Sequence, residues 1–92
     1  MKKLRIFYLE GCPYCAMARR AVRELDGEPE AAGAEIEWID ERAEAELAEA
    51  YDYYYVPSVF DGDRKLYEAR PSHSYGDVLA GIRSALRDAR EL

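Results

Sequence analysis

The stretch that decides the fold is LRIFYLEGCPYC, residues 4–15. Its apolar first half is typical of a β-strand, and Glu10-Gly11 interrupts this run. Pro13 then opens a helical pattern, because a proline lacks the N–H that would have no partner at the first position of a helix. The two cysteines of the chain, Cys12 and Cys15, therefore stand where a strand ends and a helix begins.

This position has a chemical meaning for a cysteine. The first turn of a helix carries unpaired backbone N–H groups and a partial positive charge, and both favour an anion. A thiolate on Cys12 is therefore stabilised over the thiol, and the thiolate is the species that attacks disulfides. Cys15 lies three residues on, one turn along the same helix face. The pattern predicts that Cys15 can attack a mixed disulfide formed on Cys12, which makes the pair a redox site.

Two other roles of a Cys-x-x-Cys pair are weaker. A structural zinc ion needs about four ligands, and only His73 adds a further candidate, so two chains would have to share the metal. A static structural disulfide is rare in cytosolic proteins. We therefore expect redox chemistry and no metal site.

The composition predicts one globular domain over residues 1–92, with 49% hydrophobic and 35% charged residues. No apolar run approaches the roughly 20 residues that cross a bilayer. Lys2 and Lys3 precede an apolar run, as in a signal peptide, but Arg5 cuts that run and no small-residue cleavage site follows it. We expect a cytoplasmic monomer that does not bind membranes.

The net charge of −6 is unevenly distributed along the chain. Residues 1–23 carry +5, residues 24–49 carry −10 and residues 50–92 carry −1. The acidic middle would repel phosphates, so nucleic acid is not an expected partner. The basic start either gives Cys12 a positive field or only complements the C-terminal end of the first helix through Arg19, Arg20 and Arg23.

Hydrophobic periodicity predicts strands at 3–9, 34–40, 58–60 and 65–67 and helices at 13–26, 42–52 and 75–90. The first strand is apolar on both faces and should be central, whereas the second has an acidic face and should lie at an edge. Ser74 and Asp77 have the spacing of a capping box before the last helix. The order β-α-β-α-β-β-α predicts an α/β fold with a four-stranded mixed sheet flanked by three helices.

The segment after the second strand is expected to be a helix over 42–52. Asp40 is its predicted N-cap, and Leu47 and Tyr54 are among the residues predicted on its apolar face. Four tyrosines, Tyr51 and residues 53–55, end this segment. We interpret them as packing at a helix end, with one or two of them available to line a groove.

This order of elements, with Cys-Pro-Tyr-Cys at residues 12–15 and Val56-Pro57 before the hairpin, resembles the glutaredoxins of the thioredoxin-like superfamily over nearly the whole chain. The resemblance implies a three-layer thioredoxin-like fold in which Pro57 is cis and stands opposite the cysteine pair. It also implies that Cys12 is the nucleophile and Cys15 the resolving thiol. The implied substrate-facing surface, where the backbone of Val56 pairs with an extended substrate, consists of Pro13, Tyr14, Val56 and Pro57.

The activity that the resemblance implies is dithiol–disulfide oxidoreduction of protein disulfides or glutathione mixed disulfides, with no bound cofactor and with glutathione as reductant. Two features depart from the family. Glu10 stands where glutaredoxins usually carry a basic residue, and the Gly-Gly pair that helps to hold glutathione is absent after the hairpin. Reduction by thioredoxin reductase therefore stays open. The N-terminus of the last helix, near Ser74, is the remaining place for a carboxylate, and His73 is interpreted as an ordinary loop residue.

Two further functions stay open at this point. Some glutaredoxins bridge two chains with an iron–sulfur cluster held by the first cysteine and glutathione, although a proline such as Pro13 disfavours this within the family. The other is a redox-sensitive binding module without turnover. A visible absorption band after anaerobic reconstitution would indicate the first, and a failure to reduce insulin disulfides would indicate the second.

Overall fold

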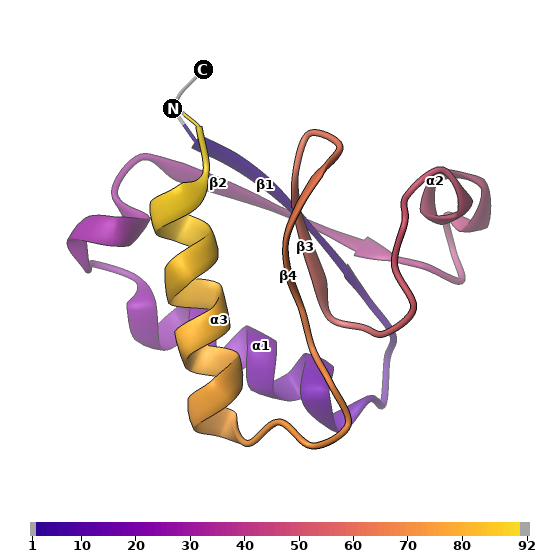
Figure 1. The fold of residues 1–92 in the computed structure, drawn as a ribbon, viewed down its shortest axis with the longest axis horizontal. Coiled ribbons are helices and arrows are strands. Elements are labelled where there is room, and N and C mark those ends of the chain that lie inside the picture. Colours follow the sequence, from indigo (N-terminus) through magenta and orange to yellow (C-terminus); the bar gives the residue numbers. More distant parts are fainter. Residues whose placement is uncertain (1, 91–92) are drawn as a thin grey trace.

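The structure is a computed structural model that describes residues 2–90. Its elements in chain order are β1 (Lys2–Tyr8), α1 (Pro13–Leu25), a 3-10 turn (Pro29–Ala31), β2 (Ala34–Asp40), α2 (Ala45–Glu49), β3 (Ser58–Asp61), β4 (Arg64–Glu68) and α3 (Tyr75–Asp88). The predicted order of strands and α-helices is confirmed, and the elements form an α/β thioredoxin-like fold (Figure 1). Of the expected domain, residues 1, 91 and 92 lie outside the described residues.

One mixed sheet of four strands has the order β2-β1-β3-β4. β1 and β2 are parallel, as expected for strands joined by a crossover helix, and the β1–β3 and β3–β4 pairs are antiparallel. The central place of β1 and the edge place of β2 are both as predicted. Across the β1–β3 pair, Phe7 lies opposite Ser58.

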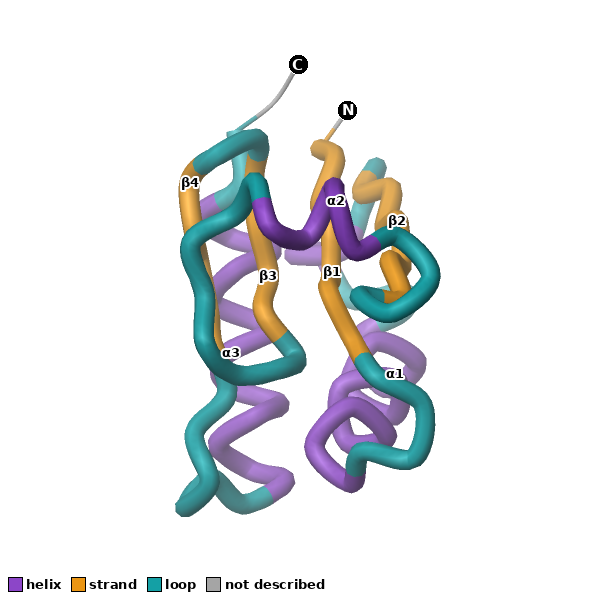
Figure 2. Tube along the Cα trace, turned by 90° about the vertical axis from the view of Figure 1, so that its right-hand side faces the viewer, coloured by secondary structure: helices purple, strands orange, loops and turns teal. Residues whose placement is uncertain are grey.

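The two faces of the sheet carry cores of different size. On one face α1 and α3 pack against each other and cover the fully buried Leu4 and Ile6 of β1. The other face is covered by α2 (Figure 2). There a smaller cluster of Phe7, Ile39 and Phe60 packs against residues of α2 and the tyrosine segment. Side chains alternate along a strand, so neighbouring residues of β1 belong to different cores. No helix within residues 2–90 has the length and apolar character needed to cross a membrane.

The second helix is shorter than the predicted span of 42–52, because α2 has only five residues. Asp40 does not cap it but remains in β2. The Asp40 carboxylate accepts hydrogen bonds from the N–H groups of Arg42 (2.9 Å) and Ala43 (3.4 Å). The Asp40 side chain thus forms an Asx-turn with the backbone that follows it, and α2 begins only after that turn.

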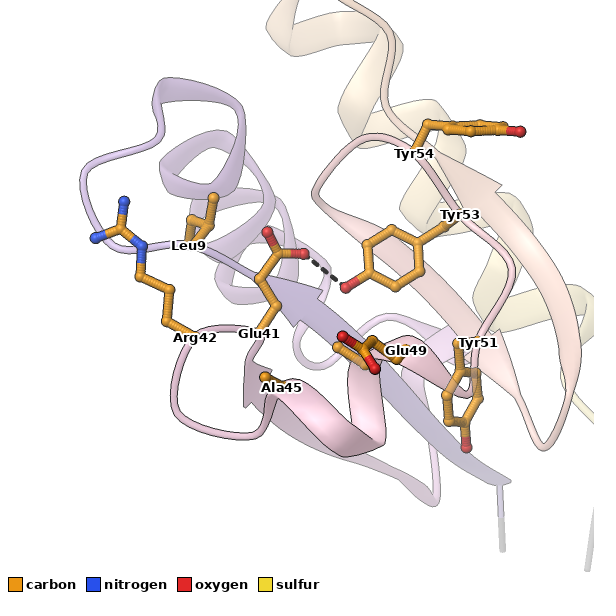
Figure 3. Close-up of a pocket in the computed structure, with 9 residues that line it drawn as sticks. Leu9, Glu41, Arg42, Ala45, Glu49, Tyr51, Tyr53 and Tyr54 are labelled. Carbon is orange, nitrogen blue, oxygen red and sulfur yellow. Dashed lines mark hydrogen bonds between the residues drawn. The ribbon is translucent and has the colours of Figure 1, made fainter.

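The tyrosines give the physical reason for the early end of α2 (Figure 3). Tyr51 and Tyr53 both pack on Phe7, with ring centroids 4.7 and 5.1 Å apart, and both also contact Phe60. Residues two apart on a helix point to opposite sides, so a continued helix would not place both rings on Phe7. The prediction that Tyr54 lies on a buried face is wrong, since this side chain is 88% exposed. Tyr51 and Tyr53 pack as expected, whereas Tyr54 and Tyr55 are exposed. Three of the four line a groove: Tyr51, Tyr53 and Tyr54.

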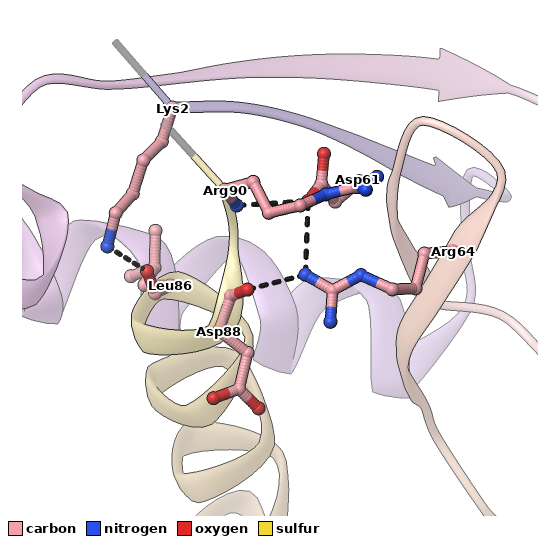
Figure 4. Close-up of polar contacts among 6 residues, drawn as sticks. All are labelled: Lys2, Asp61, Arg64, Leu86, Asp88 and Arg90. Atoms are coloured by element: carbon pink, nitrogen blue, oxygen red, sulfur yellow. Dashed lines mark hydrogen bonds and ion pairs between the residues drawn. The ribbon is translucent and has the colours of Figure 1, made fainter. Parts of the chain in front are cut away.

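Side chains fix both ends of α3. At its start the predicted capping box is present: Ser74 Oγ accepts from the Asp77 N–H (3.2 Å), and the Asp77 carboxylate accepts from the Ser74 N–H (2.9 Å). Beyond its end, the buried Asp61 carboxylate accepts from the Arg90 N–H (3.0 Å) and from Arg64 Nη2 (3.2 Å) (Figure 4). The backbone N–H of Arg90, followed by the two guanidinium groups, holds the pKa of Asp61 below its usual value. The end of α3 is thereby tied to the β3–β4 hairpin.

Candidate active site

Cys12 is the N-cap residue of α1 and is half-exposed. Its side chain makes no capping hydrogen bond, Pro13 follows it at the start of the helix, and the first turn contains no acidic residue. The Cys12 carbonyl accepts the helical hydrogen bond from the Ala16 N–H (3.0 Å). The positive end of the helix dipole therefore lies beside Cys12 without a competing carboxylate in the same turn.

Cys15 has the opposite environment, because its side chain is buried and only 3% exposed. Burial raises the pKa of the Cys15 thiol to about 12, since a thiolate there would lose its hydration. The neighbouring Cys12 raises it further, and a hydrogen bond from the Leu9 N–H to Cys15 Sγ (3.5 Å) opposes the shift without cancelling it. Both cysteines are free thiols. The pair thus consists of one accessible sulfur and one protected, protonated sulfur.

A pocket of about 250 Å³ opens beside the two cysteines. Its lining includes Tyr8, Glu10, Cys12, Cys15 and Arg19. The guanidinium carbon of Arg19 lies 4.7 Å from the Tyr8 ring centroid and 4.3 Å from that of Trp38. These cation–π contacts hold a positive charge on the pocket wall. Of the arginines in the first helix, Arg19 lines the cysteine pocket, whereas Arg23 lies in the last turn of α1.

The Val56-Pro57 peptide bond is cis, as the resemblance implied. Ser58 follows it and pairs opposite Phe7, so the antiparallel register brings Pro57 level with Tyr8, close to the loop that leads to Cys12. Val56 is half-buried and Pro57 is buried. The two segments therefore lie at the same end of the sheet, although neither Val56 nor Pro57 lines the 250 Å³ pocket itself.

Glu68 fixes the backbone just before this cis bond. One oxygen of its carboxylate accepts hydrogen bonds from the N–H groups of Tyr54 (2.6 Å) and Tyr55 (2.7 Å), and the other accepts from Lys65 Nζ (2.8 Å). The side chain is only 5% exposed. Burial alone would raise the pKa of Glu68, but the hydrogen bonds from Lys65 and the two amides outweigh it and lower the pKa. Glu68 therefore stays charged and holds the loop by charge-assisted bonds.

Tyr14 and His73 both contact the loop that leads from β4 to α3. Tyr14 is half-buried, and its hydroxyl donates a hydrogen bond to the Pro71 carbonyl. His73 Nδ1 accepts a hydrogen bond from the Arg70 N–H (3.2 Å) and lies 2.9 Å from the Tyr67 hydroxyl. These contacts make His73 a structural residue of that loop, in agreement with its interpretation from the sequence.

The sequence predicts that the N-terminus of α3 is available for a ligand carboxylate, but the structure shows that it is not. The Asp77 side chain already occupies this place, because it accepts from both the backbone and the hydroxyl of Ser74. These hydrogen bonds lower the pKa of Asp77, so a negative charge is present there. Within residues 2–90, no group of three or more His, Cys, Asp or Glu side chains is placed to hold a metal ion.

Fold and site together define a thioredoxin-like protein with a cysteine pair at the start of its first helix. The family model for glutaredoxin matches residues 4–65, which is more than half of the chain. The protein belongs to the glutaredoxin family, and this membership supports a glutaredoxin-like thiol oxidoreductase. A search of curated proteins finds no significant match.

Two contributors to the site were missed from the sequence. The Leu9 N–H, just after β1, contacts Cys15 Sγ, and Glu68, at the end of β4, accepts from the two amides before the cis proline. Neither residue type stands out in the sequence, since any residue offers an N–H and Glu is common. Arg19 was not missed, because it was among the arginines considered for a positive field around Cys12. It follows Cys12 by seven residues, two helical turns, and therefore lies on the same face of α1.

Proposed function

We propose that the protein is a cytoplasmic dithiol–disulfide oxidoreductase that reduces disulfides in proteins and glutathione mixed disulfides. The contrast between the two cysteines carries this proposal. Cys12 is accessible at the N-cap of α1, and Cys15 is buried three residues further on with a raised pKa. An accessible sulfur can attack the substrate, and a protected sulfur does not react until the mixed disulfide has formed beside it.

The proposed reaction consists of two thiol–disulfide exchanges. The Cys12 thiolate attacks one sulfur of the substrate disulfide, forms a new S–S bond and expels the other substrate sulfur as a thiolate. Cys15 then gives up its proton and attacks the Cys12 sulfur, which breaks the mixed disulfide and releases the second substrate thiolate. The substrate gains two electrons and two protons, and Cys12 and Cys15 become a disulfide.

The substrate-facing surface in this proposal consists of Pro13, Tyr14, Val56 and Pro57. The register of β1 and β3, which brings Val56-Pro57 to the end of the sheet that holds Cys12, supports this assignment. Glutathione is the proposed reductant, and the fixed charge of Arg19 on the pocket wall favours its carboxylates. The Glu10 carboxylate lines the same pocket and would repel the carboxylates of glutathione. This repulsion favours thioredoxin reductase as the alternative reductant.

Single-cysteine variants test the mechanism. Cys12→Ser should abolish reduction of insulin disulfides and of a glutathione–peptide mixed disulfide, because it removes the attacking sulfur. Cys15→Ser should abolish insulin reduction and keep exchange with the mixed disulfide, because that reaction needs only one sulfur. Activity of Cys12→Ser on both substrates would show that the nucleophile is assigned wrongly.

The reductant is tested with the unmodified protein. Turnover is followed once with glutathione, glutathione reductase and NADPH, and once with thioredoxin reductase and NADPH. Sustained turnover in the first system supports the glutathione proposal. Turnover only in the second would replace it with reduction by thioredoxin reductase.

A further inference from the structure

A second cavity adjoins the cysteine pocket on the α2 side of the sheet. It has a volume of about 640 Å³ and lies between the end of β1, α2 and the tyrosine segment (Figure 3). Leu9 lines both this groove and the cysteine pocket. A chain segment that places a disulfide at Cys12 can therefore continue directly into the groove, which we call the tyrosine groove.

The walls of the tyrosine groove are fixed in place. The Tyr53 ring stacks on Phe7, and its hydroxyl donates a hydrogen bond to Glu41 Oε1 (2.6 Å). Burial and this bond raise the pKa of Tyr53, so its hydroxyl remains a donor. Tyr54 stands at the rim with its ring exposed, while its backbone N–H is held by Glu68. The groove therefore offers an aromatic face that is already ordered before a ligand arrives.

Two carboxylates, Glu41 and Glu49, outnumber the one guanidinium in the lining of the tyrosine groove. Among residues 2–90 neither forms an ion pair. Arg42 also lines the groove, but its side chain extends away from the Glu41 carboxylate (Figure 3). Between these groups the small side chains of Ala45 and Ala48 form an apolar lining.

We propose that the tyrosine groove binds a basic segment of the disulfide-bonded substrate protein, with an arginine beside the cysteine that Cys12 attacks. This rests on the proposed function and adds a substrate class to it. The aliphatic part of an arginine would cover Ala45 and Ala48, and its guanidinium would reach Glu41 and Glu49. The exposed Tyr54 ring at the rim offers an aromatic surface to a neighbouring residue of the same segment.

The surrounding charge supports a basic rather than an acidic ligand. Residues 24–49 carry a net charge of −10, and the end of this segment, with α2, lines the groove. Such a field accelerates encounter with a basic segment and repels an acidic one, and both effects weaken as salt screens them. The groove thus selects among disulfides by the residues next to them.

Three disulfide-cyclised peptides test this inference. They share one sequence except for an arginine, glutamine or glutamate placed two residues from a cysteine. At low salt, kcat/KM should fall in the order Arg, Gln, Glu, with about a tenfold difference between the extremes, as two partly exposed charge pairs would give. The difference should shrink to about twofold in 0.5 M salt.

Charge-removing variants locate the effect. Glu41→Gln and Glu49→Gln should each reduce the Arg-to-Glu ratio about two- to threefold, because glutamine keeps the size and removes the charge. Glu46→Gln is the matched control, since Glu46 is exposed on the same helix and does not line the tyrosine groove. Its ratio should equal that of the unmodified protein.

The possible failures separate the two proposals. Equal kcat/KM for the three peptides, or an equal loss of preference in Glu46→Gln, would overturn the tyrosine groove as a basic-segment site while leaving the oxidoreductase intact. Absence of activity on every peptide and on a small neutral disulfide would overturn the oxidoreductase itself. In that case, amide chemical shifts during titration with the Arg peptide would still report on the groove, and unchanged shifts at Glu49 and Tyr54 would overturn it too.

Discussion

The unequal reactivity of the two thiols can be measured directly. The pKa of Cys15 is raised from 9.0 to about 12, so its thiolate fraction at neutral pH is lower by roughly a thousandfold. A thiolate of higher pKa is also more nucleophilic, by roughly 20-fold for this shift. Cys15 should therefore react with iodoacetamide at least about 50-fold more slowly than an unfolded cysteine, before any further slowing by its burial.

The assay uses the Cys12→Ser variant, in which Cys15 is the only thiol. Burial is the largest cause of the raised pKa, so the variant keeps most of the shift. Alkylation is followed by mass spectrometry in buffer and in urea, with Cys15→Ser as the control that reports on Cys12. Labelling of folded Cys12→Ser within about fivefold of its rate in urea would refute the reasoning.

Alkaline unfolding gives an independent readout of the same group. Folded Cys15 keeps its proton up to about pH 12, whereas the unfolded chain loses it near 9.0. The stability from this protected thiol is complete below pH 9 and is lost as the pH rises towards 12, by about 1.4 kcal/mol per pH unit. Cys12→Ser should lose this stability in urea titrations between about pH 8 and 10.5, relative to Cys12→Ser/Cys15→Ala.

Three further predictions concern positions around the site. Gly81→Ala should lower the free energy of unfolding by about 1–3 kcal/mol in urea titrations, because a Cβ there would lie 2.3 Å from Tyr67 Cε1. Gly76→Ala on the same helix, where the nearest atom is 3.6 Å away, should be neutral or stabilising. Glu68→Gln should lower the free energy of unfolding by about 1–3 kcal/mol, because glutamine lacks the charged acceptor for the two amides before the cis proline. Hydrogen exchange of these amides should become faster. Arg19→Gln should raise KM several-fold for a glutathione mixed disulfide and leave KM for a neutral disulfide unchanged.

Each of these has a clear contrary result. Equal stability of the Gly81→Ala and Gly76→Ala proteins would mean that α3 does not pack closely on the Tyr67 ring. Unchanged amide exchange in Glu68→Gln would mean that other contacts order the loop. Equal KM changes for both disulfides in Arg19→Gln would show that the arginine acts through packing on Tyr8 and Trp38 and not through its charge.

Local patterns were sufficient to predict the sheet and the long helices. Apolar residues on both faces of β1 gave its central place, the acidic face of β2 gave its edge place, and Ser74 with Asp77 gave the start of α3. The length of α2 was not predictable in the same way. Its alanines and glutamates favour a helix, but the contact of Tyr51 and Tyr53 with Phe7 ends it, and that contact joins distant parts of the chain.

In the candidate site, too, some features follow from neighbouring residues and others from contacts between distant parts of the chain. The position of Cys12 at a helix start follows from neighbouring residues, so the sequence alone placed it. The protected state of Cys15 does not, because it requires α1 to dock on the sheet and the Leu9 N–H to reach the sulfur. An isolated α1 would leave both thiols in water with similar reactivity. The different roles of the two cysteines in the proposed mechanism, attack by Cys12 and resolution by Cys15, therefore depend on the tertiary fold.

The end of β1 connects the chemistry to the proposed selectivity. Leu9 touches the cysteine pocket on one side and the tyrosine groove on the other, and its backbone N–H contacts Cys15. A substrate segment in the tyrosine groove therefore lies against the residue that borders both thiols. Binding there would position the substrate disulfide at Cys12 without using the charge of Arg19. The two charged regions can then act on different substrates, with Arg19 selecting anionic small disulfides and the groove selecting basic protein segments.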